Sequence, residues 1–143
     1  MDNVIYKSIR ELIDLLKKKK ISVTELSKLY LKQIGRVNPE LNAIIQKNED
    51  ILEKARMKDD NFEEYSKKEP LFGIPITIKD SIDTAGIITT GGTKGREKYI
   101  PKEDATIVKR LKEAGAIILG KTNTPELTLE YETTNEIFGR TNN

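Results

Sequence analysis

The sequence lacks histidine and cysteine altogether over its 143 residues. Without them the chain has no Ser-His or Cys-His nucleophile pair, no imidazole general base and no zinc site built on thiolate or imidazole ligands. Disulfide bonds within the chain are excluded as well. The options that remain are a lysine acting as a base, catalysis by carboxylates, or binding without a reaction.

Two further features are missing: an excess of one charge and a long apolar run. The chain has 25 Lys and Arg against 23 Asp and Glu, a formal net charge of +2. A nucleic-acid interface needs a one-sided basic surface, so we expect no nucleic-acid partner. No apolar run reaches the length of a membrane span, and Met1–Asn3 lacks the basic start of a secretion signal. We therefore expect no membrane partner and a cytoplasmic location. The basic run Lys17–Lys20 is typical of the solvated end of a helix.

The first seventy residues predict a helical arm. Two capping boxes begin at Ser8 and Ser22, each with a glutamate three residues later. The first box and the apolar spacing after it predict a helix over 8–19. The second predicts a helix that ends before Pro39, because the residue before a proline disfavours helical geometry.

The rest of the arm predicts one strand and one helix. The short apolar stretch 41–45 predicts the strand. The charged stretch 48–68 predicts the helix, and its candidates for burial are Ile51, Leu52, Ala55 and Met57. The arm has no catalytic pattern of its own.

From residue 71 the pattern changes to that of an α/β fold. Ile74, Ile76 and Ile78 alternate with other residues, which predicts a strand with these three side chains on one face. The glycine- and threonine-rich stretch 84–95 predicts a loop.

A helix and a second buried strand follow. We expect Asp104 to cap the helix and Gly115 to end it, before a strand over 116–119. A strand, a helix and a strand in this order predict a right-handed parallel crossover. The fold class is therefore α/β: an N-terminal helical arm (1–70) followed by part of a mixed, largely parallel sheet with a crossover helix (71–143), together one incomplete domain.

Residues 115–122, GAIILGKT, match the nucleotide-binding pattern G-x-x-x-x-G-K-[ST] in every letter. In that pattern the four middle residues form a loop whose amides surround phosphates. Here they are Ala-Ile-Ile-Leu, the strongest strand signal of the chain, with a helix before them and Asn-Thr-Pro after the match. A strand cannot also be the phosphate-binding loop, so the context disfavours nucleotide binding.

Lys79 is the candidate catalytic residue. It ends the first predicted strand, at the edge where open α/β sheets build their sites, and the glycine-rich segment 89–93 follows it. Loss of solvent at such a place can make a lysine a base at neutral pH. The alternative is a lysine that reaches out of the sheet and pairs with Asp80 or Asp83.

The tail has several carboxylates, Glu126, Glu130 and Glu132, and carboxylates in a cluster are one way to build a metal site. The tail has no Asp-rich loop and no glycine turn of the calcium-binding type, so a solvated acidic helix or loop is the favoured interpretation. We therefore expect neither a metal nor a cofactor.

Several blocks of the sequence, in this order, resemble the first part of the amidase signature family: LFGIPITIKD (71–80), TTGGT (89–93), DATIV (104–108), GAIILGKTN (115–123) and FGRTNN (138–143). The two capped helices before them match the N-terminal arm of that family more loosely. The family includes general amidases, fatty-acid amide hydrolases and the A subunit of glutamyl-tRNA amidotransferase. The segments 131–133 and 139–143 resemble general amidases more than the tRNA-linked protein.

The resemblance implies hydrolysis of carboxylic amides by a Ser-Ser-Lys triad. Lys79 corresponds to the family's lysine, which takes a proton through a bridging serine from the serine that attacks the carbonyl. Both serines of the family belong to a glycine- and serine-rich signature after the equivalent of Asn143, and no serine of this chain has that context. The resemblance thus implies a truncated N-terminal portion that is inactive alone, because the serines and the oxyanion-hole amides are missing.

The resemblance also indicates substrate-binding residues and partners. Thr93, Glu130 and Tyr131 fall where the family lines its substrate pocket, although the family often has a small residue at position 130. The expected partners are a small-molecule amide and a complementary C-terminal half. An unpaired sheet edge also predicts a homo-oligomer. The alternatives are a binding or assembly half of a split amidase or amidotransferase, and an inert relic that merely folds.

Overall fold

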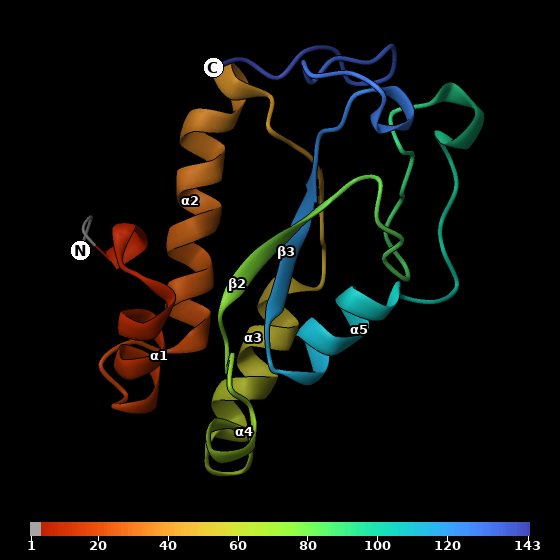
Figure 1. The fold of residues 1–143 in the computed structure, drawn as a ribbon. Coiled ribbons are helices and arrows are strands. Elements are labelled where there is room, and N and C mark those ends of the chain that lie inside the picture. Colours follow the sequence, from red (N-terminus) through yellow and green to blue (C-terminus); the bar gives the residue numbers. More distant parts are fainter. Residues whose placement is uncertain (1–3) are drawn as a thin grey trace.

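The computed structural model describes residues 4–143, so the expectation about a secretion signal at Met1–Asn3 lies outside it. Helices α1 and α2 lie on one side of a small sheet and α5 on the other (Figure 1). The elements in chain order are η1 (Val4–Tyr6), α1 (Ile9–Lys17), α2 (Val23–Leu41), β1 (Ile44–Lys47), α3 (Ile51–Asp60), α4 (Phe62–Lys68), β2 (Pro75–Lys79), η2 (Lys94–Arg96), α5 (Thr106–Glu113), β3 (Ile117–Thr122) and η3 (Glu126–Thr128).

Both predicted capping boxes are present. The backbone N–H of Glu11 donates to the Ser8 hydroxyl at 3.3 Å, and the N–H of Ser8 donates to the Glu11 carboxylate at 2.9 Å. Ser22 and Glu25 form the same reciprocal pair at 3.0 and 2.8 Å. The starts of α1 and α2 are therefore confirmed, since each box satisfies N–H groups that a helix leaves unpaired.

The predicted end of the second helix is wrong, because α2 continues through Pro39 to Leu41. Pro39 lies in the last turn, where its missing N–H removes only one helical hydrogen bond. The helix ends instead at Asn42, which takes the left-handed conformation with φ 51°. Asparagine tolerates this conformation better than most residues.

The strand expected over 41–45 is displaced to Ile44–Lys47. The side-chain oxygen of Asn38 accepts hydrogen bonds from the backbone N–H of Ala43 and Ile44, at 3.0 and 2.7 Å. These bonds turn the chain out of the helix and delay the strand.

The prediction of one continuous helix over 48–68 is wrong. The segment forms two helices, because α3 ends and α4 begins at Asn61. The backbone N–H and the side-chain amide of Asn61 both donate to the Met57 carbonyl, at 3.2 and 2.8 Å. Such local side-chain bonding is the means by which asparagine competes with helical geometry.

One expected core position of this segment is wrong. Met57 is 48% exposed, and Lys58 is buried in its place with its ammonium 2.5 Å from the Glu69 carboxylate. The other expected core residues are wholly or partly buried: Ile51, Leu52 and Ala55.

The sheet is mixed, with the strand order β1-β3-β2. β1 runs antiparallel to β3, and β2 runs parallel to it, with α5 between β2 and β3 in the sequence. The predicted parallel pairing across a helix is therefore confirmed. The strand expected over 116–119 extends to Thr122.

Each face of the sheet has its own apolar cluster. The expectation that Ile74, Ile76 and Ile78 share one face is wrong, because Ile74 joins the larger cluster and Ile78 the smaller one. Ile74 precedes β2, which begins at Pro75, so it lies outside the regular alternation of the strand. The larger cluster combines residues of the helical arm with residues after position 70, including Leu12, Leu16, Val23, Leu26, Phe72, Ile117 and Leu119.

β3 contains one extra residue, Leu119, between the positions that pair with Ile76 and Thr77 of β2. Such a bulge reverses the alternation of side chains beyond it. Lys121 therefore lies opposite Ile78, on the face that α5 covers.

Asp104 does not cap α5, contrary to expectation. The N-cap is Ala105, and no side chain bonds the first turn. The Asp104 carboxylate instead accepts hydrogen bonds from the N–H of Ala85 at 2.8 Å and from the ammonium of Lys112 at 2.7 Å. The Asp104 carboxylate therefore binds these two residues and not the N–H groups of the first turn of α5. Gly115, with φ +97°, follows the end of the helix as predicted.

Candidate functional site

Lys79 is the last residue of β2 and pairs with Thr122, the last residue of β3. Because these strands are parallel, they end at the same edge of the sheet, where the loops that follow them meet. Lys79 is half-buried there, and its carbonyl accepts a hydrogen bond from the N–H of Ile82 at 3.0 Å. The chain therefore turns immediately after the lysine.

The carboxylates that the alternative interpretation assigned to Lys79 have other partners. Asp80 is fully buried and accepts hydrogen bonds from the N–H of Thr90, at 3.1 and 3.2 Å, and from its hydroxyl. Asp83 pairs with Arg96 at 2.8 Å. Within the part of the chain that the structure describes, the Lys79 ammonium has no hydrogen bond and no ion pair.

Asp80 is the buried acid of this site. Burial raises the pKa of Asp80 above its ordinary value, because loss of solvent disfavours the charged form. The hydrogen bonds from Thr90 and the positive charge of Lys121 act in the opposite direction. Its bonds to Thr90 tie the end of β2 to the glycine-rich loop.

The loop segment 89–93 folds back toward the end of β2. The N–H of Gly91 donates to the Asp80 carbonyl at 3.2 Å. Gly92 has φ +74°, and a Cβ added to it would lie 2.9 Å from the carbonyl oxygen of Pro125. Only glycine fits this backbone against Pro125. The hydrogen bond of Gly91 holds the turn close to Asp80, the residue that follows Lys79.

The three predicted pocket residues are placed differently from one another. Thr93 is half-buried and precedes η2. Glu130 is exposed and lines an open hollow of about 640 Å³, whereas Tyr131 is fully exposed. The N–H of Leu127 donates to the Gly91 carbonyl at 2.8 Å, so the tail that contains the hollow is joined to the turn after β2.

Lys121 is a buried charge that the sequence analysis treated only as part of the nucleotide-binding pattern. It is fully buried, and its ammonium donates to the Ile82 carbonyl at 2.5 Å and to the hydroxyls of Thr89 and Thr84 at 2.9 and 3.2 Å. Burial lowers its pKa to about 8, against the opposing effect of nearby carboxylates. The available signal was a charged residue two positions after the apolar stretch 116–119.

The nucleotide-binding pattern does not form a loop. β3 spans Ile117–Thr122, so the middle of the pattern is a strand whose amides face β1 and β2. It offers no ring of amides to a phosphate, in agreement with the sequence analysis.

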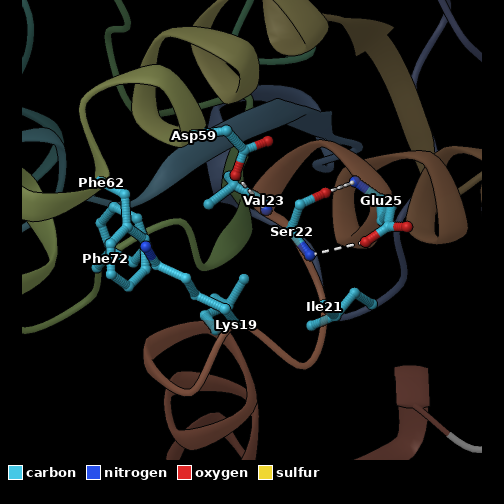
Figure 2. Close-up of a pocket in the computed structure, with 9 residues that line it drawn as sticks. Lys19, Ile21, Ser22, Val23, Glu25, Asp59, Phe62 and Phe72 are labelled. Carbon is cyan, nitrogen blue, oxygen red and sulfur yellow. Dashed lines mark hydrogen bonds between the residues drawn. The ribbon is translucent and has the colours of Figure 1, made fainter.

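A second hollow, of about 270 Å³, lies where α1 turns into α2 and faces α3 and α4 (Figure 2). The Asp59 carboxylate accepts hydrogen bonds there from the N–H groups of Val23 and Thr24, at 2.8 and 2.9 Å. The Lys19 ammonium lies 4.2 Å from the centre of the Phe62 ring. These charged groups already have partners, so we assign no chemistry to this hollow.

No three carboxylates within residues 4–143 lie close enough together to hold a metal ion. Acidic residues of the tail form single surface pairs instead, such as Glu136 with Lys94 at 2.7 Å and Glu132 with Arg140 at 3.5 Å. None of the helices in the same range is both long enough and apolar enough to cross a lipid bilayer.

Comparison with known sequences identifies one family. The family described as Amidase matches residues 25–143. The chain is 42% identical to the A subunit of the glutamyl-tRNA(Gln) amidotransferase of Thermoanaerobacter pseudethanolicus. The match covers 95% of this chain and 28% of that protein.

Solved structures agree with this match. The peptide amidase of Stenotrophomonas maltophilia superposes with a TM-score of 0.87 at 31% identity, over 96% of this chain and 30% of that one. An amidase family protein of Bacillus anthracis str. Ames gives a TM-score of 0.87 at 33% identity, over 99% and 29%. The chain therefore spans less than a third of the length of each of these proteins.

Proposed function

The chain belongs to the amidase family, and we propose that it provides the general base of an enzyme that hydrolyses carboxylic amides. The observation that supports this proposal is the position of Lys79. It ends β2 at the edge of the sheet, half-buried, and neither Asp80 nor Asp83 pairs with it. A general base must be able to accept a proton, whereas an ion pair would hold the lysine in its charged form.

In the mechanism that the family implies, Lys79 accepts a proton from a bridging serine, which takes one from the nucleophilic serine. The nucleophilic oxygen bonds to the amide carbonyl carbon, the C–N bond breaks, and the amine leaves with a proton. Water then cleaves the acyl-serine ester, which releases the carboxylic acid and restores the serine.

The serines of this chain have other roles. Ser8 and Ser22 cap helices, and Ser27 and Ser66 are buried in the helical arm. Ser81 follows Asp80 directly, outside any glycine- and serine-rich stretch. We therefore propose that both catalytic serines come from a segment outside these residues, and that the chain by itself does not hydrolyse amides.

The substrate class that we propose is a small carboxylic amide. Its support is the family together with the names of the relatives, which include part of an amidotransferase and a peptide amidase. Thr93, Glu130 and Tyr131 are the proposed pocket residues. The segments 131–133 and 139–143 favour a general amidase, and a glutamine-dependent amidotransferase is the alternative.

Complementation tests this function. The chain is co-expressed with the C-terminal part of the Thermoanaerobacter pseudethanolicus protein, and ammonia release from simple amides and from glutamine is measured. We expect turnover by the pair and none by either part alone. Lys79→Ala should abolish turnover, whereas Lys109→Ala, an exposed lysine of α5, should leave it unchanged. Turnover that survives Lys79→Ala would contradict the proposal, and so would a stable but inactive pair.

We also propose that the free chain associates with itself. Within the described residues, the outer edges of β1 and β2 have no strand partner. Leu127 and Leu129 are 57% and 78% exposed. Open edges and exposed apolar side chains favour association, so light scattering should show dimers or larger species at moderate concentration. A clean monomer would count against this.

A further inference from the structure

The buried ammonium of Lys121 has a full set of partners. It has three N–H donors, and three oxygen atoms accept from it. The hydroxyl of Thr84 gives its own hydrogen to the Ile82 carbonyl at 3.2 Å, and that of Thr89 gives its hydrogen to the Ile87 carbonyl at 3.1 Å. The lone pairs of both hydroxyls are therefore left to accept from the ammonium.

None of these partners is a carboxylate. Asp80 and Asp83 act on Lys121 from a longer distance, as does the positive charge of Arg96, and no ion pair joins Lys121 to a described residue. An apolar side chain of the same length would avoid burying a charge at all. Stability alone therefore does not account for a lysine at this position, and its role has to follow from what its partners share.

The partners of Lys121 all belong to the chain segment that leaves Lys79. The Ile82 carbonyl accepts from Lys121, while the N–H of the same residue donates to the Lys79 carbonyl at 3.0 Å. Thr89 lies at the far end of this segment, next to Thr90, which bonds the Asp80 carboxylate. Lys121 thus binds this segment at both ends, at Ile82 and at Thr89. The segment is also bonded to Lys79, and the neighbouring Thr90 is bonded to Asp80.

We propose that Lys121 is a positioning residue for Lys79: its ammonium acts as a tethered cation that organises the segment 82–89 and thereby fixes the end of β2. This inference rests on the proposed function only where it names Lys79 as the base. The bulge at Leu119 is what directs Lys121 to this segment, because it reverses the alternation of β3.

The first test uses the chain itself and requires no activity. Hydrogen exchange of backbone amides is measured in the wild type, in Lys121→Met and in Lys109→Met, which changes an exposed lysine of α5. In Lys121→Met, the amides of Asp80 and Ile82 and those of 84–91 should exchange about tenfold faster or more, while amides of α2 keep their rates. Equal rates in the wild type and Lys121→Met would overturn the proposal.

A second pair of variants covers the case in which Lys121→Met fails to fold. Thr89→Val keeps the shape of the side chain and removes one acceptor of the ammonium, whereas Thr89→Ser retains the hydroxyl. We expect faster exchange at Asp80 and Ile82 in Thr89→Val and near wild-type rates in Thr89→Ser. Equal rates in the two variants would overturn the proposal.

The third test separates positioning from structure. In the complemented enzyme, Lys121→Met should lower kcat about tenfold or more and change KM little, because the base is displaced while the substrate pocket persists. Unchanged kcat together with faster exchange would reduce Lys121 to a structural role and overturn the proposal. If the wild-type pair shows no turnover, or its turnover survives Lys79→Ala, the proposed function fails, and the exchange data still decide whether Lys121 orders the end of β2.

Discussion

Lys58 and Lys121 are both buried, but the chain holds them in opposite ways. Lys58, in the helical arm, meets a carboxylate directly, with its ammonium 2.5 Å from Glu69. Lys121, in the central strand, meets only a carbonyl and two hydroxyls. The first arrangement neutralises a charge with a charge, and the second surrounds a charge with neutral oxygen atoms.

The two arrangements predict different effects when one group is removed: a loss of global stability for Lys58 and a loss of local order for Lys121. Removing one partner of a buried ion pair leaves an uncompensated charge and costs about 3–5 kcal/mol. Removing a lysine that only neutral groups surround leaves no such charge, so the free energy of unfolding should change little. The loss should instead appear in the segment 82–89, which the lysine organises. The predictions below begin with the largest effect. The first and the third test this contrast, and the second tests the close β1–β3 packing beside the bulge that places Lys121.

Glu69→Leu should lower the free energy of unfolding by about 3 kcal/mol, because it leaves the Lys58 ammonium buried without its carboxylate. The measurement is urea denaturation followed by circular dichroism. Glu64→Leu is the matched control, since Glu64 forms a surface pair with Lys68 at 3.1 Å, and it should cost less than about 0.5 kcal/mol. Equal losses in the two variants would remove the distinction between the buried pair and a surface pair.

Gly120→Ala should lower the free energy of unfolding by about 2 kcal/mol. A Cβ at this position would meet the backbone of β1, including the carbonyl oxygen of Gln46 and, at 3.1 Å, the Cα of Lys47. Neither can move without disturbing the β1–β3 pairing and the adjacent bulge. Gly35→Ala is the control, because a Cβ there meets nothing within 4 Å, and in α2 it should be neutral or stabilising by up to about 1 kcal/mol. Thermal or urea denaturation compares the two, and a similar response would contradict the steric argument.

The pH dependence of Lys121 should produce the smallest of the three effects. Burial lowers its pKa from 10.5 to about 8, so between these values the unfolded chain binds a proton that the folded chain has released. The free energy of unfolding therefore rises with pH in this window, and below it the folded state bears the cost of the buried charge. Relative to Lys121→Met, the wild type should gain about 1 kcal/mol between pH 7 and pH 9.

Urea denaturation at several pH values measures this difference. Asp80, Asp83 and Arg96 face Lys121 in both proteins, so the comparison isolates the lysine. A difference that stays constant with pH, or that falls as pH rises, would show that the buried ammonium does not titrate in this window.

The features that the sequence predicted well depend on neighbouring residues. The helix starts at Ser8 and Ser22 follow from a serine and a glutamate three residues apart, and the structure has both. The position of Lys79 at a strand end follows from the alternation before it and the glycines after it. The predicted end of α2 before Pro39 is wrong, because the effect of a proline on a helix depends on how near it lies to the helix end.

The features that the sequence did not predict depend on distant partners. Asp104 was expected to cap the next helix, but Ala85 and Lys112 bind it instead. Lys121 could not be placed from the strand pattern alone, because a one-residue bulge decides which face it occupies and its acceptors lie more than thirty residues earlier. Local patterns thus indicated the position of the proposed base, Lys79, while the contacts around it had to come from the folded chain.

The strand order has a consequence for synthesis of the protein. β3 lies between β1 and β2, yet it is translated after both of them. Ribosomes add about 5–20 residues per second, so β1 leaves the exit tunnel several seconds before the strand that completes it. During that interval β1 and β2 have no native neighbour in the sheet, whereas the helices with capping boxes can already form. The nascent chain should therefore acquire its helical half first and close its sheet in a single late step.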